Sequence, residues 1–278
     1  MYKLLSSHKI LSFTLIIILI QSCATVPITG RRQLKMIPDE TIQSTSAEQY
    51  KSFLAEHKIS SDSRGIRLVK KVGTRIQHAV EMYLESEGLS HLLDGYDWEF
   101  SLIESKELNA WCMPGGKVVV YTKILKAAQN EGGLAVIIGH EIAHAIAEHG
   151  NERMSQILLA QMGGIALSTA LAQRPQQTQQ LWMDAFGMGA SLGVLLPFSR
   201  THESEADHLG LIFMSIAGYD PNYAIGFWER MAEMSENNAP DEFFSTHPSD
   251  ERRIREIQKL IPSVMEYYED SDKVPVRH

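Results

Sequence analysis

The chain has 278 residues, of which 44% are hydrophobic and 22% are charged. This is the composition of an ordinary globular protein, and it excludes wholesale disorder and a collagen-like structure. The formal net charge of −8 argues against a general nucleic-acid binder, and two cysteines are too few for a disulfide framework.

Residues 1–22 have the pattern of a secretory signal peptide, in which a weakly basic start precedes the apolar run 10–20. That run is short for a membrane span. Cys23 follows a small residue directly after it, an arrangement that resembles the lipobox of bacterial lipoproteins. The resemblance implies a lipid on Cys23, and Ala24 in place of an aspartate favours the periplasmic face of the outer membrane. We expect residues 23–38 to form a lipidated tether; a secreted protein with a chance cysteine is the alternative.

Beyond the tether, hydrophobic spacing predicts a mainly helical domain. Residues 97–103 alternate like a strand, and the β-branched run 117–121 follows the turn signal Pro114-Gly115-Gly116. Apolar residues at three-to-four spacing predict helices over 39–57, 62–86, 123–130, 132–149, 151–172, 178–193, 201–217, 221–236 and 250–261. The pattern predicts one α+β domain over 39–268, with a small early β-sheet and a large helical part, followed by a mobile tail over 269–278.

Residues 140–144 read H-E-I-A-H within an apolar helix. Because side chains four residues apart lie on one face of a helix, His140 and His144 can bind the same Zn²⁺. Glu141 projects nearby and can take a proton from a water molecule that the metal activates. Two histidines and a glutamate on a buried helix would be costly without such a partner. We therefore predict a zinc site with His140 and His144 as ligands and Glu141 as the general base.

The residues that follow this motif offer weak candidates for a third ligand. A metzincin-type site needs glycine and histidine where this chain has Ala147 and Gly150, so that class is excluded. His149 lies five residues after His144, roughly 140° around a continuous helix, and is expected to be a surface residue at the helix end. Glu148 has a better angle, but it lies one turn further from the first histidine. We therefore expect the third ligand from another helix.

Residues 199–207, S-R-T-H-E-S-E-A-D, supply that helix. Glu203 and Asp207 are four residues apart and share a helix face. One carboxylate can bind zinc while the other accepts an N–H from a ligating histidine, which fixes its tautomer and orientation. Glu205 is expected to face elsewhere. The alternative is a charged, solvated helix start, since acids favour helix N-termini.

The two motifs together, HEIAHAIAEHG and SRTHESEAD, resemble the gluzincin zinc metallopeptidases of the HtpX and CaaX-prenyl-endopeptidase family, in particular its periplasmic lipoprotein branch. The resemblance implies a zincin-like, mainly helical domain. It also implies one Zn²⁺ bound by His140, His144 and Glu203. Glu141 would be the general base, and Asp207 would orient a ligating histidine.

Residues 108–121 also resemble this family, whose segment before the zinc helix places a strand along the cleft. The resemblance implies that the substrate backbone pairs with the edge of this strand. The residues implied to line the substrate are Asn109, Ala110, Trp111, Cys112 and Met113. The segment can equally be a plain hairpin of the sheet. Cys112 is not a typical ligand in the family, and we interpret it as a small buried hydrophobe.

Residues 246–254, T-H-P-S-D-E-R-R-I, match a late signature of the same family. The resemblance implies two roles for His247, either as a fourth, inhibitory zinc ligand or as a hydrogen-bond donor to the oxyanion. Arg253 would stabilise the tetrahedral intermediate. The alternatives are a histidine that caps a loop and an arginine whose salt bridge holds that loop.

Residues 157–196 separate the two zinc motifs and carry only Arg174 and Asp184 as charges. Their first apolar part, 157–172, is short for a membrane span. We expect a helical hairpin that packs on the domain or covers the cleft, where it would gate substrate entry. Docking to the membrane or to outer-membrane proteins is the alternative.

These features predict a zinc-dependent endopeptidase that is lipid-anchored at the outer membrane and hydrolyses peptide bonds of periplasmic or outer-membrane proteins. Its expected partners are protein or peptide substrates, the membrane through the lipid on Cys23, and outer-membrane assembly machinery. No nucleic-acid partner is expected. The alternative is a chaperone or assembly factor for outer-membrane proteins, with a latent zinc site that His247 plugs.

Overall fold

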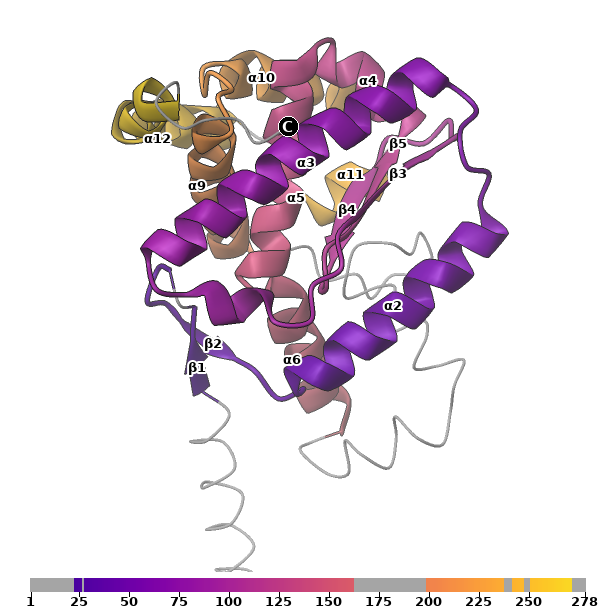
Figure 1. Cartoon of the computed structure of the whole chain (residues 1–278), viewed down its shortest axis with the longest axis vertical. Helices are drawn as coiled ribbons and strands as arrows, with labels where there is room; N and C mark the ends of the chain where they lie inside the picture. Colours follow the sequence, from indigo (N-terminus) through magenta and orange to yellow (C-terminus); the bar gives the residue numbers. More distant parts are fainter. Residues whose placement is uncertain (1–22, 27, 163–198, 238–241, 248–250, 272–278) are drawn as a thin grey trace, which may run out of the picture.

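The computed structural model describes residues 23–26, 28–162, 199–237, 242–247 and 251–271. The predicted signal peptide, the predicted helix 178–193 and most of the expected hairpin lie outside these residues. The described elements (Figure 1) are β1 (Cys23–Thr25), β2 (Arg32–Leu34), α2 (Asp39–Glu56), α3 (Ser63–Ser86), the 3-10 turn η1 (Ser90–Leu93), β3 (Glu99–Ile103), β4 (Ala110–Met113), β5 (Lys117–Tyr121), α4 (Thr122–Ala128), α5 (Glu131–Ile146), α6 (His149–Met162), α9 (Arg200–Ile216), α10 (Tyr223–Asn237), α11 (Glu242–Thr246) and α12 (Glu251–Ser271). The predicted class, α+β and mainly helical, is confirmed.

A three-stranded sheet has the order β3-β5-β4. The central strand β5 runs parallel to β3 and antiparallel to β4, so Val119 lies opposite Ser101 on one side and Trp111 on the other. The hairpin between β4 and β5 turns at Gly115 and Gly116, whose φ angles are 86° and 81°. Glycine adopts this left-handed conformation without steric cost, so the predicted turn has the residues that its geometry requires.

Alternation along β5 divides the sheet between two layers of helix. Val119 packs in a cluster with aromatic residues of α2, including Tyr50 and Phe53. Val118 and Val120 belong instead to the larger core that α3, α5 and α9 share. The sheet is therefore buried on both faces, with α2 on one side and α3 and α5 on the other (Figure 1).

Helix α5 is the centre of the domain. Asn130 caps its first turn by accepting a hydrogen bond from the Gly133 backbone N–H. All residues of α5 from Gly132 to Ile146 are buried, and α3, α4, α9, α10 and β4 pack around it. A helix that is apolar on all sides must be enclosed in this way.

Helix α12 extends beyond its predicted end at residue 261. It continues through Pro262 to Ser271 and packs against α9. Proline removes one backbone hydrogen bond, but Ile261 and Val264 on either side of it are buried. The packing of this face offsets the lost bond. The predicted end at residue 261 was therefore wrong.

A segment that we name the N-terminal strap, residues 28–37, precedes α2 and lies on α6. The backbone N–H of Met36 donates to Ser155 Oγ at 3.0 Å, and Asn151 Nδ2 donates to the Ile37 carbonyl at 2.9 Å. Ile37 itself is buried. The part of the chain that we expected to be a tether is thus packed on the domain over these residues.

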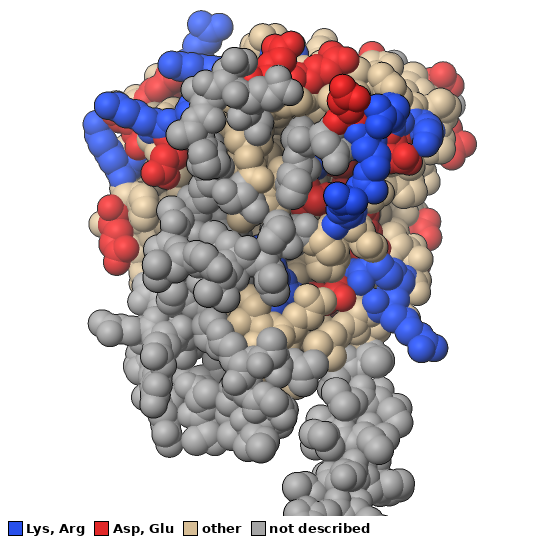
Figure 2. Space-filling view, turned by 180° about the vertical axis from the view of Figure 1, so that it is seen from behind, with Lys and Arg blue, Asp and Glu red and all other residues tan. Residues whose placement is uncertain are grey.

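The surface of the described residues carries charges of both signs. Figure 2 shows basic and acidic side chains interspersed over the face opposite to that of Figure 1. Among the described helices, none is long and apolar enough to span a membrane.

A candidate metal centre

Two glycines allow the helices that carry the zinc motifs to lie very close together. A Cβ atom on Gly210 of α9 would lie 2.9 Å from the backbone nitrogen of His140, and one on Gly139 would lie 3.0 Å from the Gly210 carbonyl oxygen. Either side chain would push α5 and α9 apart. This contact brings the H-E-x-x-H face of α5 against the start of α9, where Glu203 and Asp207 lie.

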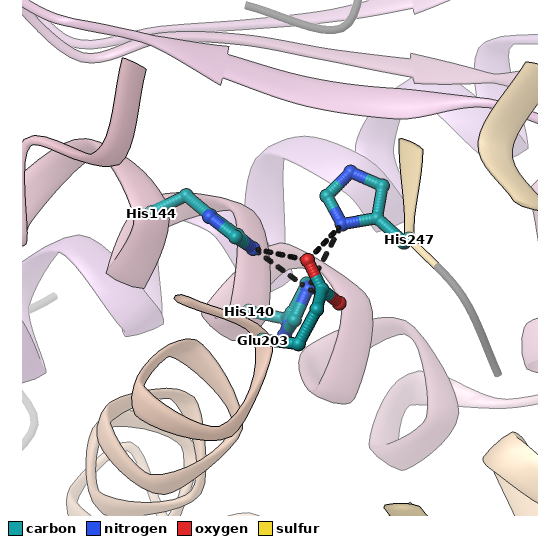
Figure 3. Close-up of side chains that lie close together, drawn as sticks. All are labelled: His140, His144, Glu203 and His247. Atoms are coloured by element: carbon teal, nitrogen blue, oxygen red, sulfur yellow. Dashed lines mark hydrogen bonds and ion pairs between the residues drawn. The ribbon is translucent and has the colours of Figure 1, made fainter. Parts of the chain in front are cut away.

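Four buried side chains converge between α5, α9 and the residue after α11 (Figure 3). His140 Nε2 lies 3.1 Å from His144 Nε2 and 3.4 Å from His247 Nδ1. Glu203 Oε1 lies 3.3 Å from His144 Nε2 and 3.0 Å from His247 Nδ1. A tetrahedral zinc ion with bonds of about 2.0–2.2 Å holds its ligand atoms about 3.3–3.5 Å apart. The observed spacings of 3.0–3.4 Å lie within a few tenths of an ångström of that range, so a small adjustment of the side chains would accommodate one zinc ion.

The protonation states also suit a metal. Burial lowers the pKa of His144 well below its usual value, which leaves a neutral imidazole. Burial alone would raise the pKa of Glu203, but the charges of His247 and Arg253 bring it well below the usual range. Burial and Arg253 lower the pKa of His140, whereas the neighbouring carboxylates raise it to about 9, so a metal ion would displace a proton there.

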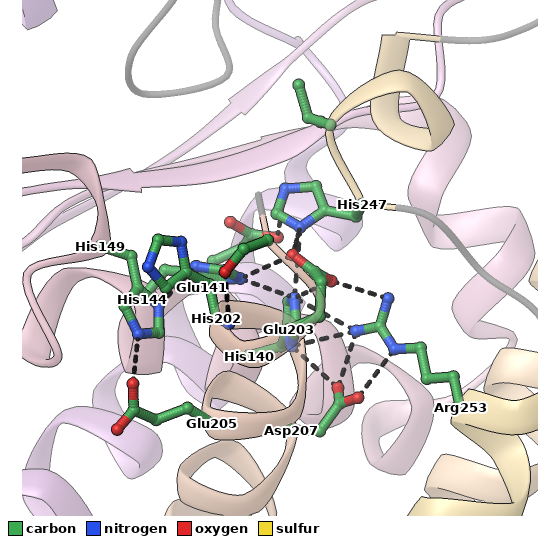
Figure 4. A network of polar contacts seen from close by, with 12 residues as sticks. His140, Glu141, His144, His149, His202, Glu203, Glu205, Asp207, His247 and Arg253 are labelled. Carbon is green, nitrogen blue, oxygen red and sulfur yellow. Dashed lines mark hydrogen bonds and ion pairs between the residues drawn. The ribbon is translucent and has the colours of Figure 1, made fainter. Parts of the chain in front are cut away.

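Asp207 and Arg253 lie next to this group, below it and to its right in Figure 4. Asp207 Oδ1 is 3.0 Å from His140 Nδ1, which places it to orient that imidazole as the sequence predicts. Arg253 donates to both oxygens of Asp207, at 2.7 and 2.8 Å, and lies 2.9 Å from Glu203 Oε2. Its guanidinium also stacks on Trp228. These contacts favour the alternative role for Arg253, a salt bridge that holds its own segment, here by joining α12 to the carboxylates of α9.

Glu141 occupies the position expected of a general base. Its side chain is buried beside the four-residue group, and its Oε1 lies 3.8 Å from His247 Nε2. That oxygen makes no hydrogen bond within the described part of the chain. Burial raises the pKa of Glu141, although nearby histidines lower it in part. A water molecule bound at the metal group could donate the hydrogen bond that this buried carboxylate oxygen lacks.

The predicted substrate strand is β4, and Asn109 directly precedes it. Within the described residues β4 pairs with one strand, β5, and it lies beside α5. The side chains predicted to line the substrate are nevertheless buried: Asn109, Ala110, Trp111, Cys112 and Met113. Any pairing with a substrate would therefore use the backbone edge. Burial raises the pKa of the Cys112 thiol, which agrees with its interpretation as a small hydrophobe.

The structure corrects the prediction for His149 and shows what Glu205 contacts. The expected helix 132–149 stops at Ile146, and the left-handed φ of 56° at Glu148 redirects the chain before α6 begins at His149. The angle counted along a continuous helix therefore does not apply. His149 is fully buried, and its Nδ1 lies 2.9 Å from His144 Nδ1. Glu205 faces it, with Oε2 2.8 Å from His149 Nε2.

Little in the sequence could have indicated this contact. Ala147 and Glu148 continue the helical pattern without a glycine or proline to mark the break. The available signal was a histidine and an acid without an assigned role, each inside one of the two motifs. Glu148 itself points to Lys35, whose Nζ lies 2.7 Å from Glu148 Oε1.

The comparisons with known proteins agree with this centre. Residues 70–261 match the family described as Peptidase family M48. The mitochondrial metalloendopeptidase OMA1 of Schizosaccharomyces pombe is 32% identical over 248 residues, which cover 89% of this chain and 69% of that protein. Human mitochondrial metalloendopeptidase OMA1 is 30% identical, with 87% of this chain and 47% of that protein covered. The Escherichia coli beta-barrel assembly-enhancing protease is 27% identical, with 62% of this chain and 37% of that protein covered.

The family match extends over more than half of the chain and includes both zinc motifs, the strands β3 to β5 and the residues His247 and Arg253. The predicted resemblance to a gluzincin family is thereby confirmed. The chain belongs to peptidase family M48, a family of zinc-dependent metalloendopeptidases.

Proposed function

We propose that this protein is a zinc-dependent endopeptidase that hydrolyses peptide bonds within protein substrates. The observation that carries the proposal is the buried group of His140, His144 and Glu203, whose mutual spacings fit one zinc ion, with Glu141 beside it. Membership of family M48 supports the same class of reaction.

The side chains around the group have distinct tasks in this reaction. Zinc, when bound by His140, His144 and Glu203, would polarise the substrate carbonyl and lower the pKa of a water molecule. Glu141 would accept a proton from the attacking water and deliver it to the leaving amine. The raised pKa of Glu141 helps it to hold that proton between the two steps. Asp207 keeps His140 oriented, since it faces His140 Nδ1 at 3.0 Å.

For substrate binding, we propose that an extended peptide adds to the edge of β4. The strand is four residues long and lies beside α5, the helix that carries Glu141. Backbone pairing at such an edge gives affinity for many sequences, which suits a protease that acts on varied or misfolded proteins.

The proposed location is the periplasmic face of the bacterial outer membrane, with a lipid on Cys23. The lipobox-like sequence supports this, as does the name of the Escherichia coli relative, a beta-barrel assembly-enhancing protease. Envelope proteins and the outer-membrane assembly machinery are the proposed substrates and partners. Metabolic labelling with a radioactive fatty acid should mark the wild type and not Cys23→Ser, and equal labelling of both would contradict the anchor.

A second candidate function rests on His247. Its Nδ1 lies 3.0 Å from Glu203 Oε1 and 3.4 Å from His140 Nε2, so it can complete a closed four-ligand zinc site. Closed sites are typical of structural zinc, whereas catalytic sites keep a position open. In that state the protein would act as a chaperone or assembly factor with latent protease activity. His247→Ala should then raise the rate of cleavage, and an unchanged or lower rate would exclude the plug.

The deciding experiment is casein cleavage by the purified full chain, with its zinc content measured in parallel. Glu141→Gln should lose cleavage by about 10²-fold or more, because the general base is gone, and should keep its zinc. Glu56→Gln, at the exposed end of α2, is the matched control and should behave as the wild type. Cleavage that survives in Glu141→Gln would refute the assignment of the base.

A further inference from the structure

The two zinc-motif histidines each have a second ring nitrogen that faces away from the metal group. For His140 this is Nδ1, which faces Asp207 directly. For His144 it is also Nδ1, but its neighbour is the ring of another histidine, His149, at 2.9 Å. An acid, Glu205, lies one step further along this path, with its Oε2 2.8 Å from His149 Nε2.

One arrangement of protons satisfies this chain of contacts. A zinc ion on His144 Nε2 requires the proton of that ring on Nδ1, so His144 donates to His149 Nδ1. His149 then carries its own proton on Nε2 and donates it to the Glu205 carboxylate. Each ring is neutral and each contact has one donor and one acceptor. The dashed lines of Figure 4 follow part of this path from the metal group.

The N-terminal strap holds the far end of the same chain. Arg31 Nε lies 2.8 Å from Glu205 Oε2, and Thr29 donates to Glu205 Oε1. The Arg31 guanidinium also binds Glu152 at 2.7 Å. A bridge between two acids from α6 and α9 fixes the orientation of Glu205, since a planar guanidinium presents its donors in a rigid fork.

We propose that His149 and Glu205 are positioning residues for the zinc ligand His144, and that Arg31 makes the N-terminal strap part of the metal centre. The inference rests on the proposed zinc site at His140, His144 and Glu203. It explains why a histidine and an acid that do not themselves bind the zinc are buried in line with a ligand. It also couples zinc affinity to the docking of the segment that follows Cys23.

The test is the zinc affinity of the metal-free full chain, measured by competition with a chromogenic chelator. His149→Ala and Glu205→Ala should each weaken zinc binding about 10–100-fold, the usual effect of losing a partner behind a ligand. Glu205→Gln keeps an oxygen that can accept the hydrogen bond from His149. Its zinc affinity should therefore lie between those of wild type and Glu205→Ala. Asn151→Ala is the matched control, because it removes a buried hydrogen bond of α6 without touching the path to zinc.

The control separates positioning from stability. Asn151→Ala should lower the melting temperature and leave the zinc affinity within about twofold of wild type, as expected for a site that keeps its ligands and their partners. The absorption bands of bound Co²⁺ should change in His149→Ala and not in Asn151→Ala. Wild-type affinity and an unchanged Co²⁺ spectrum in His149→Ala would overturn the proposal.

The double variant tests whether His149 and Glu205 act as one unit. His149→Ala with Glu205→Ala should bind zinc no more weakly than His149→Ala alone, because the path is already broken. Additive losses would show that the two residues act separately and would overturn the path.

Two variants at basic residues of the strap, Arg31 and Lys35, test whether the strap contributes to zinc binding. Arg31→Ala should weaken zinc binding several-fold, an effect smaller than that of removing Glu205 itself. Lys35→Ala removes the other ion pairs of the strap, with Glu148 and Asp39, and should leave zinc affinity unchanged. Equal effects of the two variants would refute the role of Arg31.

Failure of this inference and failure of the proposed function give different results. If wild type binds zinc and cleaves casein while His149→Ala and Glu205→Ala bind zinc normally, only the positioning role is wrong. If these variants lose affinity but wild type cleaves nothing, the positioning role stands and the protease proposal fails. A wild type that binds no zinc would overturn both.

Discussion

The two histidines of the zinc helix are held by the same neighbouring helix in different ways. His140 meets Asp207 directly at 3.0 Å. His144 reaches Glu205 through the ring of His149, and Glu205 is held in turn by Arg31 of the N-terminal strap. The His140 side therefore depends on two packed helices, whereas the His144 side depends on a helix break and on a segment more than a hundred residues away. The second side should be the more easily disturbed from the N-terminus.

The largest expected effect is on the His140 side. Asp207→Ala removes the acceptor of His140 and breaks the ion pair between Asp207 and the buried guanidinium of Arg253, which keeps its ion pair with Glu203. We expect a loss of about 3 kcal/mol in the free energy of unfolding, measured in urea on the metal-free protein. Asp39→Ala, which removes an acid from a half-exposed pair with Lys35, should cost less than about 1 kcal/mol. Equal losses would mean that Asp207 is not a buried partner.

Removal of the metal should destabilise the folded protein, because both the His140 side and the His144 side of the site lose the ion that joins them. If zinc binds the folded chain but not the unfolded chain, it stabilises the fold by about 2.7 kcal/mol when the free zinc concentration is one hundred times the Kd. A chelator should therefore lower the melting temperature, and added zinc should restore it. The shift should be smaller in His149→Ala. An unchanged melting temperature in the presence of the chelator would argue against a zinc site in the folded protein.

The crossing of α5 and α9 positions both sides together. Gly210→Ala would place a Cβ 2.9 Å from the His140 backbone nitrogen, and we expect a cost of about 1–3 kcal/mol in unfolding free energy, together with weaker zinc binding. Gly226→Ala in α10 is the control, because its Cβ would meet only the flexible end of Arg230 at 3.3 Å. Alanine is the better helix former, so that variant should be neutral or up to about 1 kcal/mol more stable. Equal behaviour of both variants would contradict the close crossing.

The smallest expected effect is at Glu152 of α6, which pairs with Arg31 of the strap. Burial alone raises the pKa of Glu152, but hydrogen bonds from His202 and Arg31 lower it to about 2 from an ordinary value of 4.5. Because the folded pKa is depressed, ionised Glu152 stabilises the fold above about pH 4.5, and this stabilisation is lost as the pH falls towards 2. Glu152→Gln should cost about 1–2 kcal/mol at pH 7 and less at pH 3, measured by urea unfolding. A cost that does not change with pH would contradict the ion pair.

Several features of the site could be predicted because they are properties of a single helix. The spacing of His140 and His144 places them on one face of α5 wherever that helix lies, and the same holds for Glu203 and Asp207 on α9. The β-branched run 117–121 and the turn before it are also local signals, and the structure places β5 over the same residues, directly after the turn at Gly115 and Gly116. The family resemblance, which rests on these local motifs, extended the prediction to zinc and to the reaction.

Other features depend on how distant segments pack. The redirection of His149 at Glu148, the continuation of α12 through Pro262 and the pairing of Arg31 with Glu205 have no local signal in the sequence. Each is decided by burial. A left-handed residue, a proline within a helix or a buried charge is unfavourable by itself and is stable only where the surrounding structure supplies a compensating partner. The sequence by itself determined which residues can bind zinc, and only the tertiary structure decided which residues hold them in place, because those partners come from parts of the chain that meet only after folding.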